Sequence, residues 1–145
     1  LCTSFKVELL EGDHDFNNGA DTFKVALLKA NASITGTYGA ATTNYSDVTG
    51  NSDELPNGSG YTTGGYTLTN VNPTSGGTTA FTDFSANAQW TSATFTTRGC
   101  IIYNSSDGNS AVAMINFGAD YSVSGGTFEI QWPTADSSNA IIRIA

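Results

Sequence analysis

Charged side chains are scarce in this chain of 145 residues. Asp, Glu, Lys and Arg make up 12% of it, about half the share of an ordinary globular domain. Only 5 of them are basic, against 13 acidic ones, and the formal net charge is −8. Phosphate contacts require clustered Lys and Arg, and an anionic membrane surface attracts basic segments. The composition therefore argues against a nucleic-acid partner and against docking on a membrane.

Long apolar runs and cysteines are also rare. No stretch approaches the roughly 18 apolar residues of a membrane-spanning helix. Glu8 and Glu11 interrupt the segment in which an export signal would need an apolar run, so we expect no such signal. Cys2 and Cys100 cannot form a disulfide scaffold, and they are either one bridge or two free thiols. The apolar neighbours of Cys100 favour a small buried side chain, and this cysteine usage fits synthesis in a reducing cytoplasm.

Groups that could catalyse a reaction or bind a metal are correspondingly few. His14 is the single histidine, so it would have to serve any Ser-His-Asp triad, and no G-x-S-x-G motif marks a nucleophilic serine. Because Asp13 and Asp15 flank His14, this segment is either a hard-cation site or a solvated acidic loop, and we favour the loop. We expect no enzymatic activity, no cofactor and no bound metal.

Two carboxylates flank Trp132 in the sequence, an arrangement found in sugar-binding and glycosidase clefts. They belong to Glu129 and Asp136. Alternation along a strand places Glu129 on the face opposite Phe128 and Ile130. We therefore expect Glu129 on the solvent face, with the apolar side chains, including Trp132, in the core.

Uncharged polar residues replace the missing charges. Ser, Thr, Asn and Gly together account for 65 of the 145 residues, and the chain also has 8 Phe, 6 Tyr and 2 Trp. Such aromatic side chains are numerous enough to anchor a core, which a disordered chain lacks. The composition is typical of a folded, β-rich domain with a neutral polar surface.

Short segments of strand character alternate with turns rich in Gly and Asn. A hairpin turn is expected at 104–109, and 30–60 is expected to be mostly loop. This spacing predicts an all-β fold, a single antiparallel β-sandwich domain over residues 1–145 that is jelly-roll-like. The expected strands are 22–29, 66–71, 78–84, 87–97, 100–103, 110–117, 126–132 and 140–144.

The only expected helix lies in the first dozen residues, within an N-terminal helix or arm over 1–20. Thr3 or Ser4 is the expected cap, and Gly12 the expected stop. Apolar residues at helical spacing are expected on one side of this helix. Three aromatic residues further along the chain form a candidate carbohydrate platform. For the apolar side of the helix and for the aromatic residues alike, packing in the core is the alternative. The candidate contact residues are Phe5, Leu9 and Leu10 in the helix, and Tyr61, Tyr66 and Trp90 in the aromatic group.

Several segments together resemble a family of small virion proteins of tailed bacteriophages, especially those of marine bacteria and cyanobacteria. The resemblance spans nearly the whole chain, and its C-terminal part is the most similar. The matching segments are Ser4 to Gly12, Asp21 to Leu27, Gly60 to Gly65, Arg98 to Asn104, Phe117 to Asp120, Trp132 to Asp136 and Ser138 to Ala145.

This resemblance implies a non-enzymatic virion component. Within a virion we expect a capsid decoration (cement) protein, which would bind the major capsid protein on the outer surface of an icosahedral head and form a homotrimer. A surface with few charges forms broad contacts with little desolvation of charge. The alternatives are a tail or head-fibre component, either a tail-tube subunit or a carbohydrate-binding module that recognises a receptor.

Overall fold

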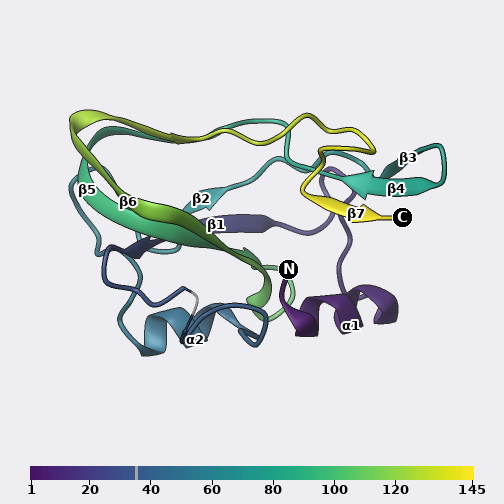
Figure 1. Ribbon diagram of the computed structural model, residues 1–145, viewed down its shortest axis with the longest axis horizontal. Coiled ribbons are helices and arrows are strands. Elements are labelled where there is room, and N and C mark those ends of the chain that lie inside the picture. Colours follow the sequence, from purple (N-terminus) through teal and green to yellow (C-terminus); the bar gives the residue numbers. More distant parts are fainter. Residues whose placement is uncertain (35) are drawn as a thin grey trace.

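Two antiparallel sheets form the body of the protein, in a computed structural model that describes residues 1–34 and 36–145 (Figure 1). The larger sheet has the strand order β2-β1-β5-β6, and the smaller sheet has the order β3-β4-β7. The all-β prediction is confirmed, as is the short N-terminal helix. The strands are β1 (Phe23–Lys29), β2 (Tyr66–Thr67), β3 (Thr74–Gly76), β4 (Thr79–Thr82), β5 (Ala88–Asn104), β6 (Ser110–Ile130) and β7 (Ile142–Ile144), and the helices are α1 (Thr3–Glu11) and α2 (Tyr45–Gly50).

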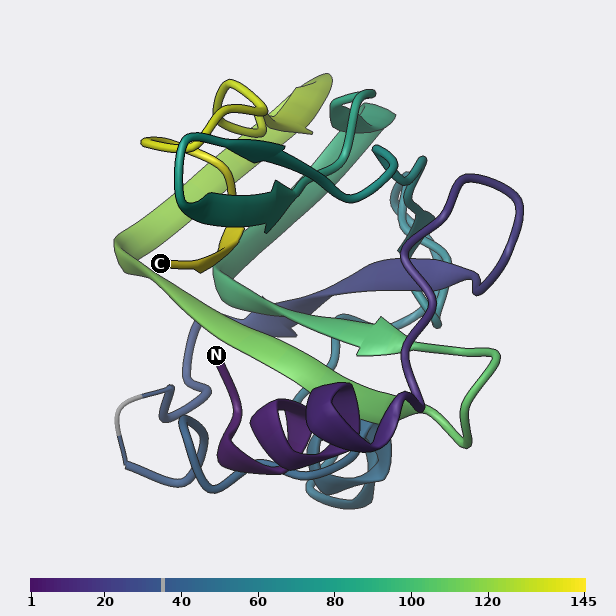
Figure 2. The same ribbon diagram turned by 90° about the vertical axis from the view of Figure 1, so that its right-hand side faces the viewer.

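One long, bent hairpin dominates the larger sheet. Strands β5 and β6 pair from Ala88 opposite Ile130 to Asn104 opposite Ser110. At the corner β5 contributes Arg98 alone, whereas β6 contributes the four residues 117–120, among them Gly118 with a φ of +81°. The additional residues let β6 turn back, so that the second half of the hairpin lies over the first, as Figures 1 and 2 show.

The core lies between the two halves of this hairpin and around β1. A single cluster of buried apolar residues extends along the chain from Cys2 to Ile142. Residues 25–28 of β1 are buried in succession, as expected for a strand covered on both faces. Cys100 is buried as predicted, and both cysteines are free thiols, so no bridge joins them.

Helix α1 starts differently from the prediction but ends where predicted. It begins after Cys2, which has extended backbone and makes no side-chain cap. Instead, the Cys2 and Thr3 amides donate to the carbonyl oxygens of Val112 and Ala40, at 2.9 and 2.7 Å. Contacts with distant parts of the chain therefore fix the start of this helix, and the local sequence does not encode it. The predicted end is confirmed, because Gly12 has a left-handed φ of +88°.

The segment expected to be mostly loop contains helix α2, so the prediction of a single helix was wrong. Asn44 and Asp47 form a capping box at its start: the Asn44 side chain accepts from the Ser46 amide, and Asp47 accepts from the Asn44 amide. The helix is tied to the hairpin turn at 104–109, because the Asn44 side chain donates to the Gly108 carbonyl oxygen at 2.9 Å.

The strands expected at 87–97 and 100–103 are one strand, and so are those expected at 110–117 and 126–132. Turns rich in Gly and Asn are expected between the predicted strands, but Gly99, Gly118 and Gly125 lie inside β5 and β6. Gly118 and Gly125 have positive φ angles and occupy irregular points of the ladder, where a glycine bends the strand without ending it. The strand expected at 66–71 is limited to Tyr66–Thr67.

Candidate functional site

A buried cluster of tyrosines surrounds Glu54, which is 7% exposed. Its carboxyl accepts hydrogen bonds from Tyr61 at 2.8 Å, from the Gly64 amide at 2.7 Å and from Tyr45. The Tyr45 ring stacks on Tyr103 with centroids 4.3 Å apart, and the Tyr103 hydroxyl donates to the Gly64 carbonyl oxygen. These bonds hold the 54–65 loop against the larger sheet.

The tyrosine hydroxyls of this cluster remain protonated over the whole physiological range. Burial, together with the nearby Glu54 carboxyl, raises the pKa of Tyr103 to about 12. Burial likewise raises the pKa of Tyr61 and Tyr45 far above the ordinary value for tyrosine. Because the Glu54 carboxyl accepts three hydrogen bonds from within the chain, we assign this cluster a structural role.

His14 is buried, although its segment was expected to be a solvated loop or a cation site. Its ring lies among phenylalanine rings, with the Phe5 centroid 5.0 Å away. Its Nδ1 lies 3.0 Å from the Asn104 side-chain amide, and its Nε2 lies 3.0 Å from a Glu8 carboxylate oxygen. Both ring nitrogens therefore have a hydrogen-bond partner within the chain, while the flanking Asp13 and Asp15 residues are exposed.

Of the predicted contact residues, the structure buries three inside the chain. Phe5 is 0% exposed, Tyr61 3% and Trp90 6%. Tyr61, Tyr66 and Trp90 do come together, with the Trp90 ring about 6 Å from each of the other two. They form a layer at the core, which is the alternative to an exposed carbohydrate platform, because Trp90, in the half of the hairpin that folds back, packs against Tyr61 and Tyr66.

An exposed apolar surface lies where α1 meets the smaller sheet. Leu10 is 88% exposed and Ile144 is 58% exposed. Leu10 faces solvent because it is five residues from Phe5, about 140° farther round the helix, so it does not share the buried side with Phe5 as predicted. Leu9, Phe81 and Ile144 line a hollow of about 100 Å³. We call the surface made by Leu9, Leu10, Phe81 and Ile144 the terminal patch.

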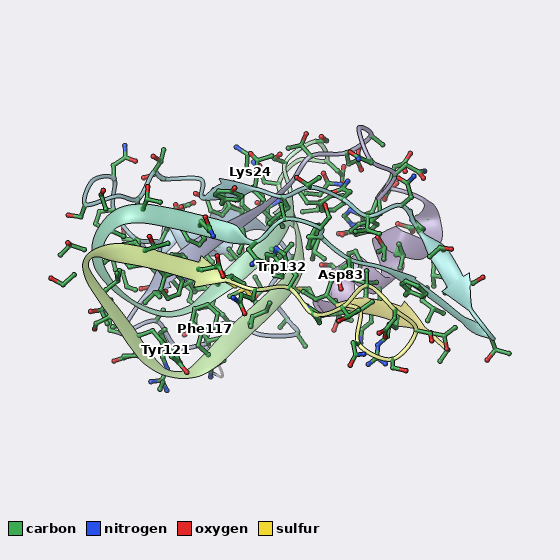
Figure 3. All side chains as sticks on the ribbon, turned by 90° about the horizontal axis from the view of Figure 1, so that it is seen from above. Lys24, Asp83, Phe117, Tyr121 and Trp132 are labelled. Atoms are coloured by element: carbon green, nitrogen blue, oxygen red, sulfur yellow. The ribbon has the colours of Figure 1, made fainter. Side chains whose placement is uncertain are left out.

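A second apolar surface, the β6 groove, opens between the two halves of the bent strand β6. It has a volume of about 390 Å³, and Figure 3 shows Phe117 and Tyr121 at the corner of the strand and Trp132 just beyond its end. The side chains expected in the core are only half-buried here, because no strand covers this edge of the described sheet. The lining residues that define it are Ile115, Phe117, Tyr121, Phe128, Glu129, Ile130, Gln131, Trp132, Pro133 and Ile141.

Polar side chains form a hydrogen-bonded row beside the groove. The amides of Gln89 and Gln131 donate to the two oxygens of the Glu129 carboxylate, the latter at 2.6 Å. These bonds lower the pKa of Glu129, so its carboxylate is ionised at neutral pH. Asp136, the other flanking carboxylate, bonds instead to Asn139 and to the amide of Ser138. The structure therefore does not bring the two carboxylates together as a catalytic pair.

The C-terminal segment separates the two surfaces. Ile141 lines the β6 groove, whereas Ile142 and Ile144 line the hollow of the terminal patch. Asp83 holds this segment: it is 1% exposed, and its carboxyl accepts from the Phe84 amide at 2.8 Å and from the Ile141 amide at 3.2 Å. Burial raises the pKa of Asp83.

Comparisons with known proteins do not place the chain in a family: no family model, no curated protein and no solved structure matches it. In residues 1–34 and 36–145, no three side chains of His, Cys, Asp or Glu gather as metal ligands would. The helices of this described part are too short to cross a bilayer.

Sequence reasoning missed the β6 groove and found only part of the terminal patch. Leu9 and Leu10 were predicted from their apolar character, but Phe81 and Ile144 come from strands far along the chain. For the groove, the alternation of Phe128, Ile130 and Trp132 correctly gives a shared face. It does not reveal that β6 bends and leaves that face open at a sheet edge.

Proposed function

We propose that this chain is a non-enzymatic structural protein of a bacteriophage virion that decorates the outer capsid surface. In this proposal the terminal patch docks on the major capsid protein, and three copies assemble around a three-fold position of the shell. The protein would be made in the host cytoplasm and would stabilise the head by burying surface across capsomer junctions. The segments that resemble small phage virion proteins support this assignment.

The observation that carries the docking part of the proposal is the exposure of Leu10 at 88%, next along α1 from Leu9, which lines an apolar hollow. Apolar surfaces of this kind mark sites of protein association. β7 is moreover an outer strand of the described β3-β4-β7 sheet, and an outer strand offers unpaired backbone groups to a partner. Few charges need to be desolvated when such a surface is buried.

Binding to expanded phage heads that lack the protein tests this proposal. Burial of a leucine side chain contributes about 1.5–3 kcal/mol, so Leu10→Asp should reduce binding by about tenfold or more in a co-sedimentation assay. Because Leu10 is exposed, the variant should keep the thermal stability of the parent protein. Tyr121→Asp is the matched control on the other surface and should bind the heads normally. Heads that bind neither the parent protein nor the control would overturn the proposal.

The β6 groove favours a second candidate, a receptor-binding module of a tail or head fibre. Aromatic side chains beside carboxylate and amide groups suit recognition of a small polar molecule. Electron microscopy of virions separates the two functions, because the second one places the protein on the tail or on a projecting tip.

A further inference from the structure

We propose that His14 is an acid-sensitive switch, which joins helix α1 to the hairpin turn at 104–109 and releases α1 when its ring takes up a proton. The neutral ring bridges Glu8 of α1 and Asn104 at the end of β5, with 3.0 Å to each. This inference concerns how the chain holds α1, so it stands or falls separately from the proposed capsid role.

The side-chain amide of Asn104 is held in one orientation by three other hydrogen bonds. Its Oδ1 accepts from the backbone amides of Ser106 and Asp107, at 3.0 and 3.3 Å. Its Nδ2 donates to the Asp21 carboxylate at 2.8 Å. A flipped amide would direct its N–H groups at two N–H donors and its oxygen at a carboxylate. Asn104 is 0% exposed, so water does not replace the bonds that a flip would break.

This orientation determines which nitrogen of the His14 ring carries the hydrogen. The atom of Asn104 that faces Nδ1 of the ring is the donor Nδ2, so Nδ1 accepts and carries no hydrogen. The ring hydrogen is therefore on Nε2, which donates it to the Glu8 carboxylate. A second proton binds only at Nδ1, where it meets an N–H group instead of an acceptor. Protonation therefore replaces the hydrogen bond to Asn104 with two opposed donors.

The apolar surroundings of the His14 ring also disfavour a charge on it. The side chain is 0% exposed, and it lies among the rings of Phe5, Phe16 and Phe23, whose centroids are 5.0 to 6.4 Å away. Strands β1 and β5 contribute Phe23 and Asn104 to these contacts, and neither residue is charged. A charged ring in this pocket loses its hydration.

The charged groups near the ring are carboxylates, and they oppose the switch only in part. The side chain of Glu8 is 22% exposed, so water screens its attraction to a charged ring. Glu8 already accepts the Nε2 hydrogen, so it gains no new bond on protonation. Asp21 is bonded to the Asn104 and Asp15 N–H groups, and Asp13 is exposed. A buried donor without an acceptor costs more than a partly exposed ion pair contributes.

Separation of the ring from the hairpin turn should loosen one end of α1. The start of the helix has bonds of its own, made by the Cys2 and Thr3 amides. Near the other end, the Glu8 side chain makes the bond to the ring. Acid should therefore free the C-terminal end of α1 first, and with it Leu9 and Leu10.

The pH dependence of stability tests the switch, because His14 is the single histidine of the chain. We would measure urea denaturation at about pH 7.5 and about pH 5.5, the interval in which a histidine of an unfolded chain takes up its proton. The control is His14→Gln, whose amide offers a donor and an acceptor but does not titrate. Other groups, such as Asp83, whose pKa is raised by burial, titrate alike in both proteins.

The expected result is a fall of about three- to tenfold in the folding equilibrium constant of the parent protein between these two pH values. The sign follows because the unfolded chain binds the proton in this interval more readily than the folded chain. His14→Gln should lack this fall. Glu8→Gln keeps an acceptor for Nε2 but removes the attraction to a charged ring, so its fall should be at least as large as that of the parent protein.

Two measurements on the parent protein alone complete the test. Nitrogen-15 resonances of the ring should place the hydrogen on Nε2 at neutral pH. Hydrogen exchange, corrected for the intrinsic rate at each pH, should show that α1 loses more protection on acidification than β5. The proposal is overturned if the ring hydrogen is on Nδ1, if the parent protein and His14→Gln have the same pH dependence, or if α1 and β5 lose protection equally.

Discussion

The terminal patch and the β6 groove are both apolar and exposed, but they are built differently. In the terminal patch the most exposed side chain, Leu10, projects from a helix with no polar group to fix its position. In the groove Trp132 is fixed by a hydrogen bond, and the Glu129 carboxylate, on the opposite face of β6, is fixed by two amides. A patch of the first kind suits a broad protein contact, and a groove of the second kind suits a small ligand.

The Asp83 carboxyl holds the C-terminal segment that contributes to both surfaces, so removing this carboxyl should affect both. Asp83→Ala takes away the acceptor of the Ile141 and Phe84 amides and leaves the buried Phe84 N–H without a partner. We expect a loss of about 1–3 kcal/mol in the free energy of unfolding, measured by urea denaturation, together with weaker head binding through the terminal patch and a shifted Trp132 indole N–H resonance in the groove. Asp83→Asn keeps one acceptor oxygen and should lose less. If Asp83→Ala disturbs only one surface, the C-terminal segment does not couple them.

Acidification should distinguish the surfaces, because Glu129 lines the groove, whereas no titratable side chain lines the hollow of the terminal patch. Hydrogen bonds from Gln89 and Gln131 lower the pKa of Glu129, so its carboxylate persists below the ordinary value of about 4.3. The side-chain amide resonances of the two glutamines should therefore be constant from neutral pH to about pH 5. They should shift once Glu129 is protonated, and the stability that these bonds contribute is lost as the pH falls through the lowered pKa.

The same titration of Glu129→Gln, followed by the side-chain amide resonances, is the control. In this variant the resonances of Gln89 and Gln131 should not depend on pH. Head binding through the terminal patch should not follow the Glu129 titration in either protein. A shift of the amide resonances well above pH 5 would assign the dependence to another group.

The smallest expected effect comes from removing the hydrogen bond that holds the Trp132 indole. Trp132→Phe keeps an aromatic ring but removes the hydrogen bond to the Ala86 carbonyl oxygen, a net contribution of about 1 kcal/mol. We expect the free energy of unfolding to fall by about this amount, measured by urea denaturation, with head binding unchanged. An unchanged free energy of unfolding would show that this hydrogen bond does not stabilise the wall of the groove.

The elements that sequence predicts well are those fixed by local chemistry. β1 follows from an apolar run between polar segments, the end of α1 from Gly12, and the hairpin turn from residues 104–109. Helix α2 was missed although Asn44 and Asp47 have the spacing of a capping box. It has six residues and lies in a segment rich in Ser, Thr and Gly, where helix periodicity is too short to detect.

The features that sequence did not predict depend on long-range geometry. Gly118 and Gly125 bend β6 without ending it, because pairing with β5 continues beyond each irregularity. The burial of His14 depends on Asn104, which lies 90 residues further along the chain. The terminal patch likewise joins residues from opposite ends of the sequence, whereas the β6 groove joins the two halves of one bent strand. Periodicity identifies which residues share a face, but it does not identify which face remains uncovered.

The orientation of the protein on a phage head tests the central claim most directly, namely that the terminal patch docks while the β6 groove stays open. Cryo-electron microscopy of decorated heads would provide it. We expect density at the three-fold positions, with α1 and β7 against the shell and the groove facing solvent. Density confined to the tail, or β6 buried against the shell, would contradict the account.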